Sequence, residues 1–181
     1  MEEELTIKIA TKEDIPHLEK LVNGAYRGES SKKGWTTEAD LLGGIRTNQD
    51  VLSGMINRGD SIVLKCINAK NELVGCVYLQ NKEEKLYLGM LTVAPDIQAQ
   101  GIGKKLLQAS EEYAQTQQCS AITITVISLR KELIKWYERR GYKATGEKKP
   151  FPSNDPRFGL PKQELEFIVM EKKLNNGISI S

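Results

Sequence analysis

Histidine and cysteine are scarce in this sequence. With His17 as the only histidine, the chain contains neither a histidine-based zinc motif nor a Ser-His-Asp triad. The three cysteines, Cys66, Cys76 and Cys119, are widely spaced and form no C-x-x-C pair, so we expect small buried side chains in a reducing compartment. No metal site is predicted, and for His17 we expect a structural or solvent-exposed role.

Long apolar runs and a strong charge of either sign are also missing. No stretch approaches the ~20 apolar residues that cross a bilayer, and the acidic start, residues 1–4, lacks the apolar segment of a signal peptide. The formal net charge is only +2, and no basic run alternates with aromatic residues, which argues against binding to nucleic acid or membranes. A cytoplasmic protein is therefore expected.

The remaining composition is that of a folded domain. An apolar fraction of 39% and a charged fraction of 28% over 181 residues predict one domain with a sizeable core. We expect this domain to span residues 1–181, with its core over 5–174 and a frayed tail over 175–181.

The most informative stretch runs from residue 86 to residue 113. Residues 86–93 are rich in apolar and β-branched side chains and predict a buried strand, which Pro95 ends because proline has no amide for a ladder. Gly89, inside this strand, predicts a bulge or a close backbone approach. After the glycines at 101 and 103 the apolar residues follow the helical period. They form the stripe Ile102, Leu106, Ala109 and Tyr113.

A helix that opens on glycines is suited to binding an anion. Its first amides have no partner within the helix, and Gly101 and Gly103 lack the Cβ atom that would hold a ligand away from the backbone. The helix dipole places roughly half a positive charge at this end, and Lys104 and Lys105 add to it. The pattern predicts a phosphate or diphosphate site. Alternatively, the glycines only shape a strand-to-helix turn.

Two motifs in order carry a family resemblance. Gln98, Gly101 and Gly103 fit the Gln/Arg-x-x-Gly-x-Gly/Ala signature of motif A in the GNAT superfamily of acyl-CoA-dependent N-acyltransferases. Residues 133–142, with Tyr137 followed by Gly141, resemble the motif B helix of the same family. The close resemblance covers residues 86–146, and outside them only the order of elements matches.

The resemblance implies an α/β fold with a mixed, mostly antiparallel seven-stranded sheet, helices on both faces and two central strands that splay apart. Strands are expected at residues 5–10, 61–67, 73–80, 86–93, 121–127, 142–148 and 164–170. Helices are expected from Thr11 to Val22, from Thr36 to Ile45, from Asn48 to Asn57, after Gly101, and from a cap at Ser128 to a stop at Gly141. Residues 149–162 hold four of the six prolines and are expected to be irregular.

The resemblance also implies acetyl-CoA as the acyl donor and co-substrate. Its diphosphate would lie on the turn formed by Gln98, Gln100, Gly101, Ile102, Gly103 and Lys104. Its pantetheine arm would pair with the backbone of Leu91 and Val93, as an added strand would. Arg130 stands where many family members have an asparagine, and it would either reach the CoA phosphates or be exposed.

Attack of an amine on a thioester needs a proton for the leaving thiolate, a donor to the oxyanion and a base. Tyr137 aligns with the family tyrosine that supplies the proton, because a phenol that ionises near pH ~10 stays protonated at neutral pH. Alternatively, Tyr137 is a core tyrosine. The family's oxyanion donor is a backbone amide near Val93. The base is left open between Glu29 or Asp40, acting through water, and a role for both as solvated surface acids.

The acceptor pocket of the family is walled by two loops, which correspond here to residues 26–37 and 151–160. Aromatic faces in these loops suit an amine or a cation, and arginines suit a carboxylate. Alternatively, the same side chains only anchor the loops. The candidates are Tyr26, Arg27, Trp35, Phe151, Arg157 and Phe158.

The resemblance implies an acetyl-CoA-dependent N-acetyltransferase that transfers an acetyl group directly to a primary amine of a small molecule or peptide. One alternative is a non-catalytic acyl-CoA-binding sensor or interaction module, because the central strand lacks a carboxylate and Arg130 departs from the family pattern. Another is a phosphate- or nucleotide-binding regulator. A homodimer is compatible with the resemblance, and nothing in the chain selects among acceptor amines.

Overall fold

The structure is a computed structural model that describes residues 4–26, 42–43, 46–95, 101–150, 160–161 and 165–174. Its strands are β1 (Thr6–Ile9), β2 (Leu42–Gly43), β3 (Ser61–Ile67), β4 (Leu73–Lys82), β5 (Lys85–Val93), β6 (Ala121–Ile127), β7 (Lys143–Pro150), β8 (Leu160–Pro161) and β9 (Glu166–Lys173). Its helices are the 3-10 turn η1 (Lys12–Asp14), α1 (Ile15–Tyr26), α2 (Gln49–Asn57), α3 (Ile102–Thr116) and α4 (Lys131–Glu138).

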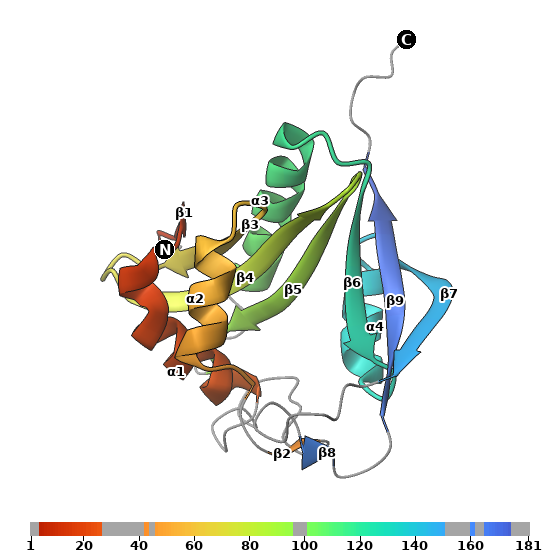
Figure 1. Ribbon diagram of the computed structural model, residues 1–181, viewed down its shortest axis with the longest axis horizontal. Helices are drawn as coiled ribbons and strands as arrows, with labels where there is room; N and C mark the ends of the chain where they lie inside the picture. The colour runs from red at the N-terminus through yellow and green to blue at the C-terminus, as the bar shows by residue number, and fades with distance from the viewer. Residues whose placement is uncertain are drawn as a thin grey trace.

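Seven strands form one sheet in the order β1-β3-β4-β5-β6-β9-β7 (Figure 1). Its neighbouring strands are antiparallel except for β5 and β6, which are parallel. The short strands β2 and β8 pair with each other. The predicted α/β class, with a mixed and mostly antiparallel seven-stranded sheet, is therefore confirmed.

Helices cover both faces of this sheet. α1 and α2 pack on one face around Leu18 and Leu52, whereas α3 and α4 belong to a separate cluster around Leu106. The neighbouring β4 residues Tyr78 and Leu79 belong to different clusters, as expected where successive side chains of a strand point to opposite faces.

Local hydrogen bonds fix the starts of the helices on the first face. The amide of Thr11 donates to the Asp14 carboxylate at 2.8 Å, which closes the turn that leads into α1. The Asn48 side chain accepts from the amide of Val51 at 2.9 Å and caps α2. Both helices therefore begin where the sequence predicts.

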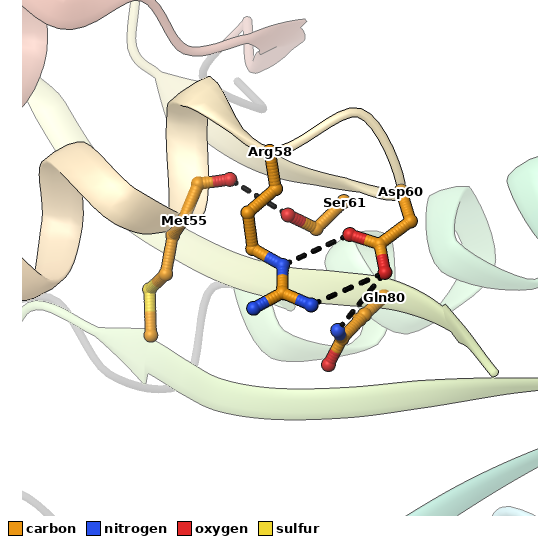
Figure 2. A network of polar contacts seen from close by, with 5 residues as sticks. All are labelled: Met55, Arg58, Asp60, Ser61 and Gln80. Carbon is orange, nitrogen blue, oxygen red and sulfur yellow. Dashed lines mark hydrogen bonds and ion pairs between the residues drawn. The ribbon is translucent and has the colours of Figure 1, made fainter.

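A polar network ties the end of α2 to β3 and β4 (Figure 2). Arg58 donates to both carboxylate oxygens of Asp60, at 2.9 and 3.2 Å, and Gln80 donates to Asp60 at 3.2 Å. The Ser61 hydroxyl donates to the carbonyl of Met55 at 2.8 Å. The hydrogen bond from Arg58 is the main reason that the pKa of Asp60 falls to about 2. The network orients α2 against the sheet.

Two predictions about regular structure are wrong. Leu42, expected in a helix, lies in β2 opposite Pro161, because pairing with a distant segment overrides the local helical period. Residues 149–162 are not wholly irregular, because Lys149 and Pro150 complete β7 opposite β9. Proline is tolerated there because an edge strand needs no ladder bond on its outer side.

The expected cap of α4 at Ser128 is also wrong. The Ser128 amide donates to the carbonyl of Glu166 at 2.9 Å, so the chain still follows the β9 side of the sheet at that point. The helix begins two residues later, with Arg130 at the N-cap position and no side-chain capping hydrogen bond.

Candidate functional site

The two central strands separate after a short shared ladder. β5 and β6 pair at Lys85–Ala121, Leu86–Ile122 and Tyr87–Thr123, and no later pair joins them among the described residues. Beyond this point β5 stays with β4 as far as Val93, and β6 stays with β9 as far as Ile127. Figure 1 shows the resulting V between the two strands. The predicted splay is therefore present, and it opens toward the carboxyl ends of both strands.

A bulge in β5 lies inside this opening. Cys76 pairs with Thr92, but Tyr78 pairs with Gly89, so β5 carries one extra residue. Met90 has a φ of +54°, which is unusual for a residue with a side chain. The bulge predicted at Gly89 thus lies beside it, and the ring of Tyr87 covers Gly89 so closely that a Cβ atom there would lie 2.8 Å from it.

The bulge reverses which face of the sheet each β5 side chain meets. Leu86 and Leu88 belong to the cluster of α3, but Met90 belongs to the cluster of α1 and α2. Leu91 and Val93 return to the α3 side. The two residues predicted to hold pantetheine therefore lie beyond the bulge, where β5 has left β6.

Helix α3 begins at the mouth of the V. Gly101 is its N-cap with a φ of +76°, and a Cβ atom there would meet nothing within 4 Å among the described residues. The first helical hydrogen bond runs from the Lys105 amide to the Gly101 carbonyl at 2.9 Å. The amides before Lys105 are therefore those that a helix leaves without an intrahelical partner.

Gly103 has a packing role that the sequence did not predict. A Cβ atom at this position would lie 3.3 Å from Cζ2 of Trp136 and 3.7 Å from Cγ2 of Val93. Its missing side chain therefore lets α3 pack against α4 and β5. Of the two motif glycines, Gly101 alone has open surroundings among the described residues.

Gly75 in β4 was not singled out from the sequence. A Cβ atom there would lie 2.8 Å from Cγ2 of Ile102 and 3.0 Å from both Leu106 and the Thr92 carbonyl. Ile102 is 1% exposed. The start of α3 is thus held against the sheet at a distance that only glycine allows. The sequence signal was present as a glycine within an otherwise apolar strand.

Tyr137 lies on α4 and is 6% exposed. Its ring packs edge-to-face between Trp136, at 5.1 Å, and Tyr142, at 5.4 Å. Tyr142 is 1% exposed, and burial, followed by the charge of Glu111, raises the pKa of its phenol. The position of Tyr137 in the core fits a tyrosine that packs, and its role as a proton donor stays a prediction.

Arg130 is 5% exposed, so the alternative that this side chain is simply exposed is wrong. It is the N-cap residue of α4 and follows the carboxyl end of β6, one of the two strands of the V. Its role toward CoA phosphates stays a prediction.

A hollow of about 850 Å³ lies on the other face, between α1 and the hairpin of β3 and β4, with Pro95 in its lining. Lys65 donates to Asp14 within it at 2.9 Å. His17 lines the hollow and is exposed, in line with the solvent-exposed role expected for it.

Several predicted site residues lie wholly or partly outside the described residues. Tyr26 ends α1, rather than lying in a loop, and its side chain is outside the described residues. The other residues outside the described part are Arg27, Glu29, Trp35, Asp40, Gln98, Gln100, Phe151, Arg157 and Phe158.

Among the described residues, no group of three or more His, Cys, Asp or Glu side chains is placed to hold a metal ion. No helix in the described ranges has the length and hydropathy needed to cross a membrane.

Solved acetyltransferases share this fold. The Escherichia coli ribosomal-protein-S18-alanine N-acetyltransferase superposes with a TM-score of 0.70 at 14% identity, covering 95% of each chain. An acetyltransferase of the GNAT family from Staphylococcus aureus has a TM-score of 0.67 at 17% identity, covering 95% of this chain and 100% of that one.

A third structure contains the acyl donor. A Bacillus anthracis protein, provisionally described as a streptothricin acetyltransferase, was solved with acetyl coenzyme A. It has a TM-score of 0.56 at 18% identity and 68% coverage of each chain.

Sequence comparison adds the family. No curated protein sequence matches the chain at a significant level. Residues 41–152, more than half of the chain, match the profile of the acetyltransferase (GNAT) domain. That range holds the splayed strands, the glycine-started helix and the helix of Tyr137, and the protein is therefore an acyltransferase of the GNAT family.

Proposed function

We propose that this protein transfers an acetyl group directly from acetyl-CoA to a primary amine of a small molecule or peptide. The observation that carries the proposal is the early end of the β5–β6 ladder, beside a helix that starts at a left-handed glycine. A parallel pair that opens after three residue pairs leaves room for an extended ligand arm. The helix start beside it offers amides and a favourable dipole to a diphosphate.

The residues present fit acetyl-CoA, which supplies an acetyl group activated as a thioester. The amides from Ile102 to Lys104 would hold the diphosphate, together with Gln98 and Gln100. The backbone of Leu91 and Val93 would hold the pantetheine arm beyond the bulge. The surroundings of Gly101 support this fit, because no described atom outside its chain neighbours lies within 4 Å of the position that a Cβ atom would occupy.

Arg130 would contribute charge toward the CoA phosphates from the start of α4. A buried guanidinium carries a desolvation cost that an anion offsets. Its 5% exposure argues against a purely solvated role.

Tyr137 would donate the proton that the leaving thiolate takes up. Its ring is fixed by aromatic neighbours on two sides, which reduces the number of orientations open to its hydroxyl. A backbone amide near Val93 would stabilise the oxyanion. Glu29 or Asp40 would serve as the base through water, and the acceptor would be bound by Tyr26, Arg27, Trp35, Phe151, Arg157 and Phe158.

The first experiment measures coenzyme A binding by calorimetry and then acetyl-CoA turnover with amino acids, spermidine, kanamycin and peptides with a free N-terminus. We expect binding, and turnover with one of these amines. Replacing Tyr137→Phe should lower kcat roughly 100-fold or more with little change in coenzyme A affinity, because general-acid catalysis contributes roughly that much.

Tyr113→Phe is the matched control for this substitution. Tyr113 lies on α3 and packs against the same core cluster, so its hydroxyl should not affect kcat. The proposal fails if calorimetry detects no binding of coenzyme A, or if the Tyr137→Phe enzyme acetylates its amine at the wild-type rate across pH. Binding without turnover over the whole panel would favour the acyl-CoA sensor instead.

A further inference from the structure

Trp136 joins the two parts of the candidate site. Its indole lies against the first turn of α3, where Cζ2 and Cη2 would be 3.3 and 3.5 Å from a Cβ atom on Gly103. The same indole meets the ring of Tyr137 edge-to-face, with ring centres 5.1 Å apart and planes at 81°. One side chain therefore contacts both the expected diphosphate turn and the expected proton donor.

Arg140, which lies in the turn just after α4, contacts this indole. The guanidinium carbon lies 4.0 Å from the centre of the Trp136 ring, and Nη1 donates to the Trp136 carbonyl at 3.1 Å. A cation over an indole face is the strongest form of cation–π contact among the aromatic side chains. The indole is thereby held over the end of α4 and has little freedom to rotate away.

Tyr137 is confined by two rings of unequal exposure. Tyr142, on one side, is 1% exposed and belongs to the closely packed core. Trp136, on the other side, is only partly buried and borders the helix start. A displacement of the first turn of α3 would therefore reach Tyr137 through Trp136, whereas Tyr142 would act as a fixed wall.

We propose that Trp136 is a positioning residue that couples occupancy of the α3 start to the orientation of the Tyr137 hydroxyl. This inference rests on the proposed transferase function. A ligand on the amides of the first turn fixes Gly103, Gly103 fixes the indole, and the indole fixes the tyrosine ring. Trp136 itself touches no reacting atom.

The first test uses fluorescence and does not depend on turnover. Trp35 and Trp136 are the two tryptophans of the chain, so Trp35→Phe leaves Trp136 as the reporter. Adding coenzyme A should change the emission of this variant at concentrations that match its calorimetric dissociation constant. An unchanged emission in the presence of calorimetric binding would overturn the inference.

The second test asks whether Trp136 acts through Tyr137. Trp136→Leu should lower kcat about tenfold for the fastest amine of the panel, because small misplacements of catalytic groups are costly. The KM for that amine should stay unchanged. In a Tyr137→Phe background the same substitution should have no further effect on kcat, which a double-mutant cycle measures.

Leu64→Ala is the control for general destabilisation. Leu64 is buried in β3, in the same core cluster but far along the sheet from α4. Its effect on kcat should be the same factor with or without the Tyr137 hydroxyl. Equal factors for Trp136→Leu in both backgrounds would refute the coupling while leaving the transferase proposal intact. If Tyr137→Phe alone has no effect, the proposed role of Tyr137 fails as well.

Discussion

The two faces of the β3–β5 half of the sheet hold their helices in different ways. On one face α3 packs very closely against its neighbours at two glycines, which have no side chain to hold the elements apart. Ile102 packs against the backbone of Gly75, and the indole of Trp136 packs against the backbone of Gly103. These contacts are so close that a single added methyl group would force its neighbours to move.

On the opposite face α1 packs through buried apolar side chains such as Leu18 and Val22, and hydrogen bonds and an ion pair add to this packing. Asn23 accepts from the amides of Arg46 and Thr47, at 2.7 and 2.9 Å, and donates to the Thr47 carbonyl at 3.0 Å. Lys65 reaches Asp14 from β3. Between these polar contacts the hollow of about 850 Å³ separates α1 from the β3–β4 hairpin.

The difference fits the part that each helix would play. Steric contact fixes a helix to within a few tenths of an ångström, and the amides at the start of α3 would need such placement to hold a diphosphate. Hydrogen bonds from Asn23 fix residues 46 and 47 beside α1, and the hollow leaves space beside the same helix. The face with the tight helix is the face of the expected acyl donor.

The largest expected effect tests the tight face. Gly75→Ala should lower the free energy of unfolding by about 3 kcal/mol. The new methyl group would clash with the side chains of Ile102 and Leu106 and with the backbone carbonyl of Thr92, which has no rotamer to change. Coenzyme A affinity should fall with it, since α3 must shift. Urea unfolding and calorimetry measure the two quantities.

Gly54→Ala is the matched control. Gly54 lies within α2, on the other face, and a Cβ atom there meets nothing within 4 Å among the described residues. The same substitution should raise stability by about 1 kcal/mol, because alanine is the better helix former. Equal effects at the two glycines would remove the distinction between the faces.

A substitution of intermediate expected effect tests the hydrogen bonds of Asn23. Asn23→Ala should cost about 2 kcal/mol in urea unfolding, because it deprives two amides and one carbonyl of their partner. Asn23→Asp keeps an acceptor for the amides and should cost less. Coenzyme A affinity should be unchanged in both variants. A loss of affinity equal to that of Gly75→Ala would show that the two faces are not independent.

The sequence predicted the order of the elements well because periodicity and turn residues are local signals. The strand at residues 86–93, the helix after Gly101 and the cap at Asn48 all follow from side chains close in the chain. Leu42 could not be placed in the same way, since its strand exists only by pairing with residue 161.

The candidate site was less accessible to sequence reasoning. Motif A drew attention to Gly103 as a ligand contact, but the position of Trp136 on another helix gives that glycine a packing role. The extra residue at Met90 shifts the alternation of β5, so that Leu88 and Met90 face opposite clusters. Neither fact is encoded by spacing along the chain.

The smallest expected effect tests whether water is excluded from the surface of the sheet that α1 and α2 cover. Cys76 belongs to the α1 and α2 cluster and is fully buried, and this burial raises the pKa of its thiol to about 12. A thiol in the unfolded chain ionises near pH ~9. The folded state therefore keeps its proton while the unfolded state loses it, and stability should fall between these values as the pH rises.

For a single group that ionises near pH ~9 in the unfolded chain, the free energy of unfolding should fall by about 1.4 kcal/mol in total between pH 8 and pH 10, which urea unfolding under reducing conditions at these two pH values would measure. Cys76→Ala should lower stability at both pH values because it leaves a cavity, but its loss between them should be smaller by that amount. Cys66→Ala, on the α3 face, should reduce the slope less, since its pKa is raised by a smaller burial effect. An unchanged slope in Cys76→Ala would mean that water reaches this thiol through the α1 face, so the looser packing there would extend to the sheet itself.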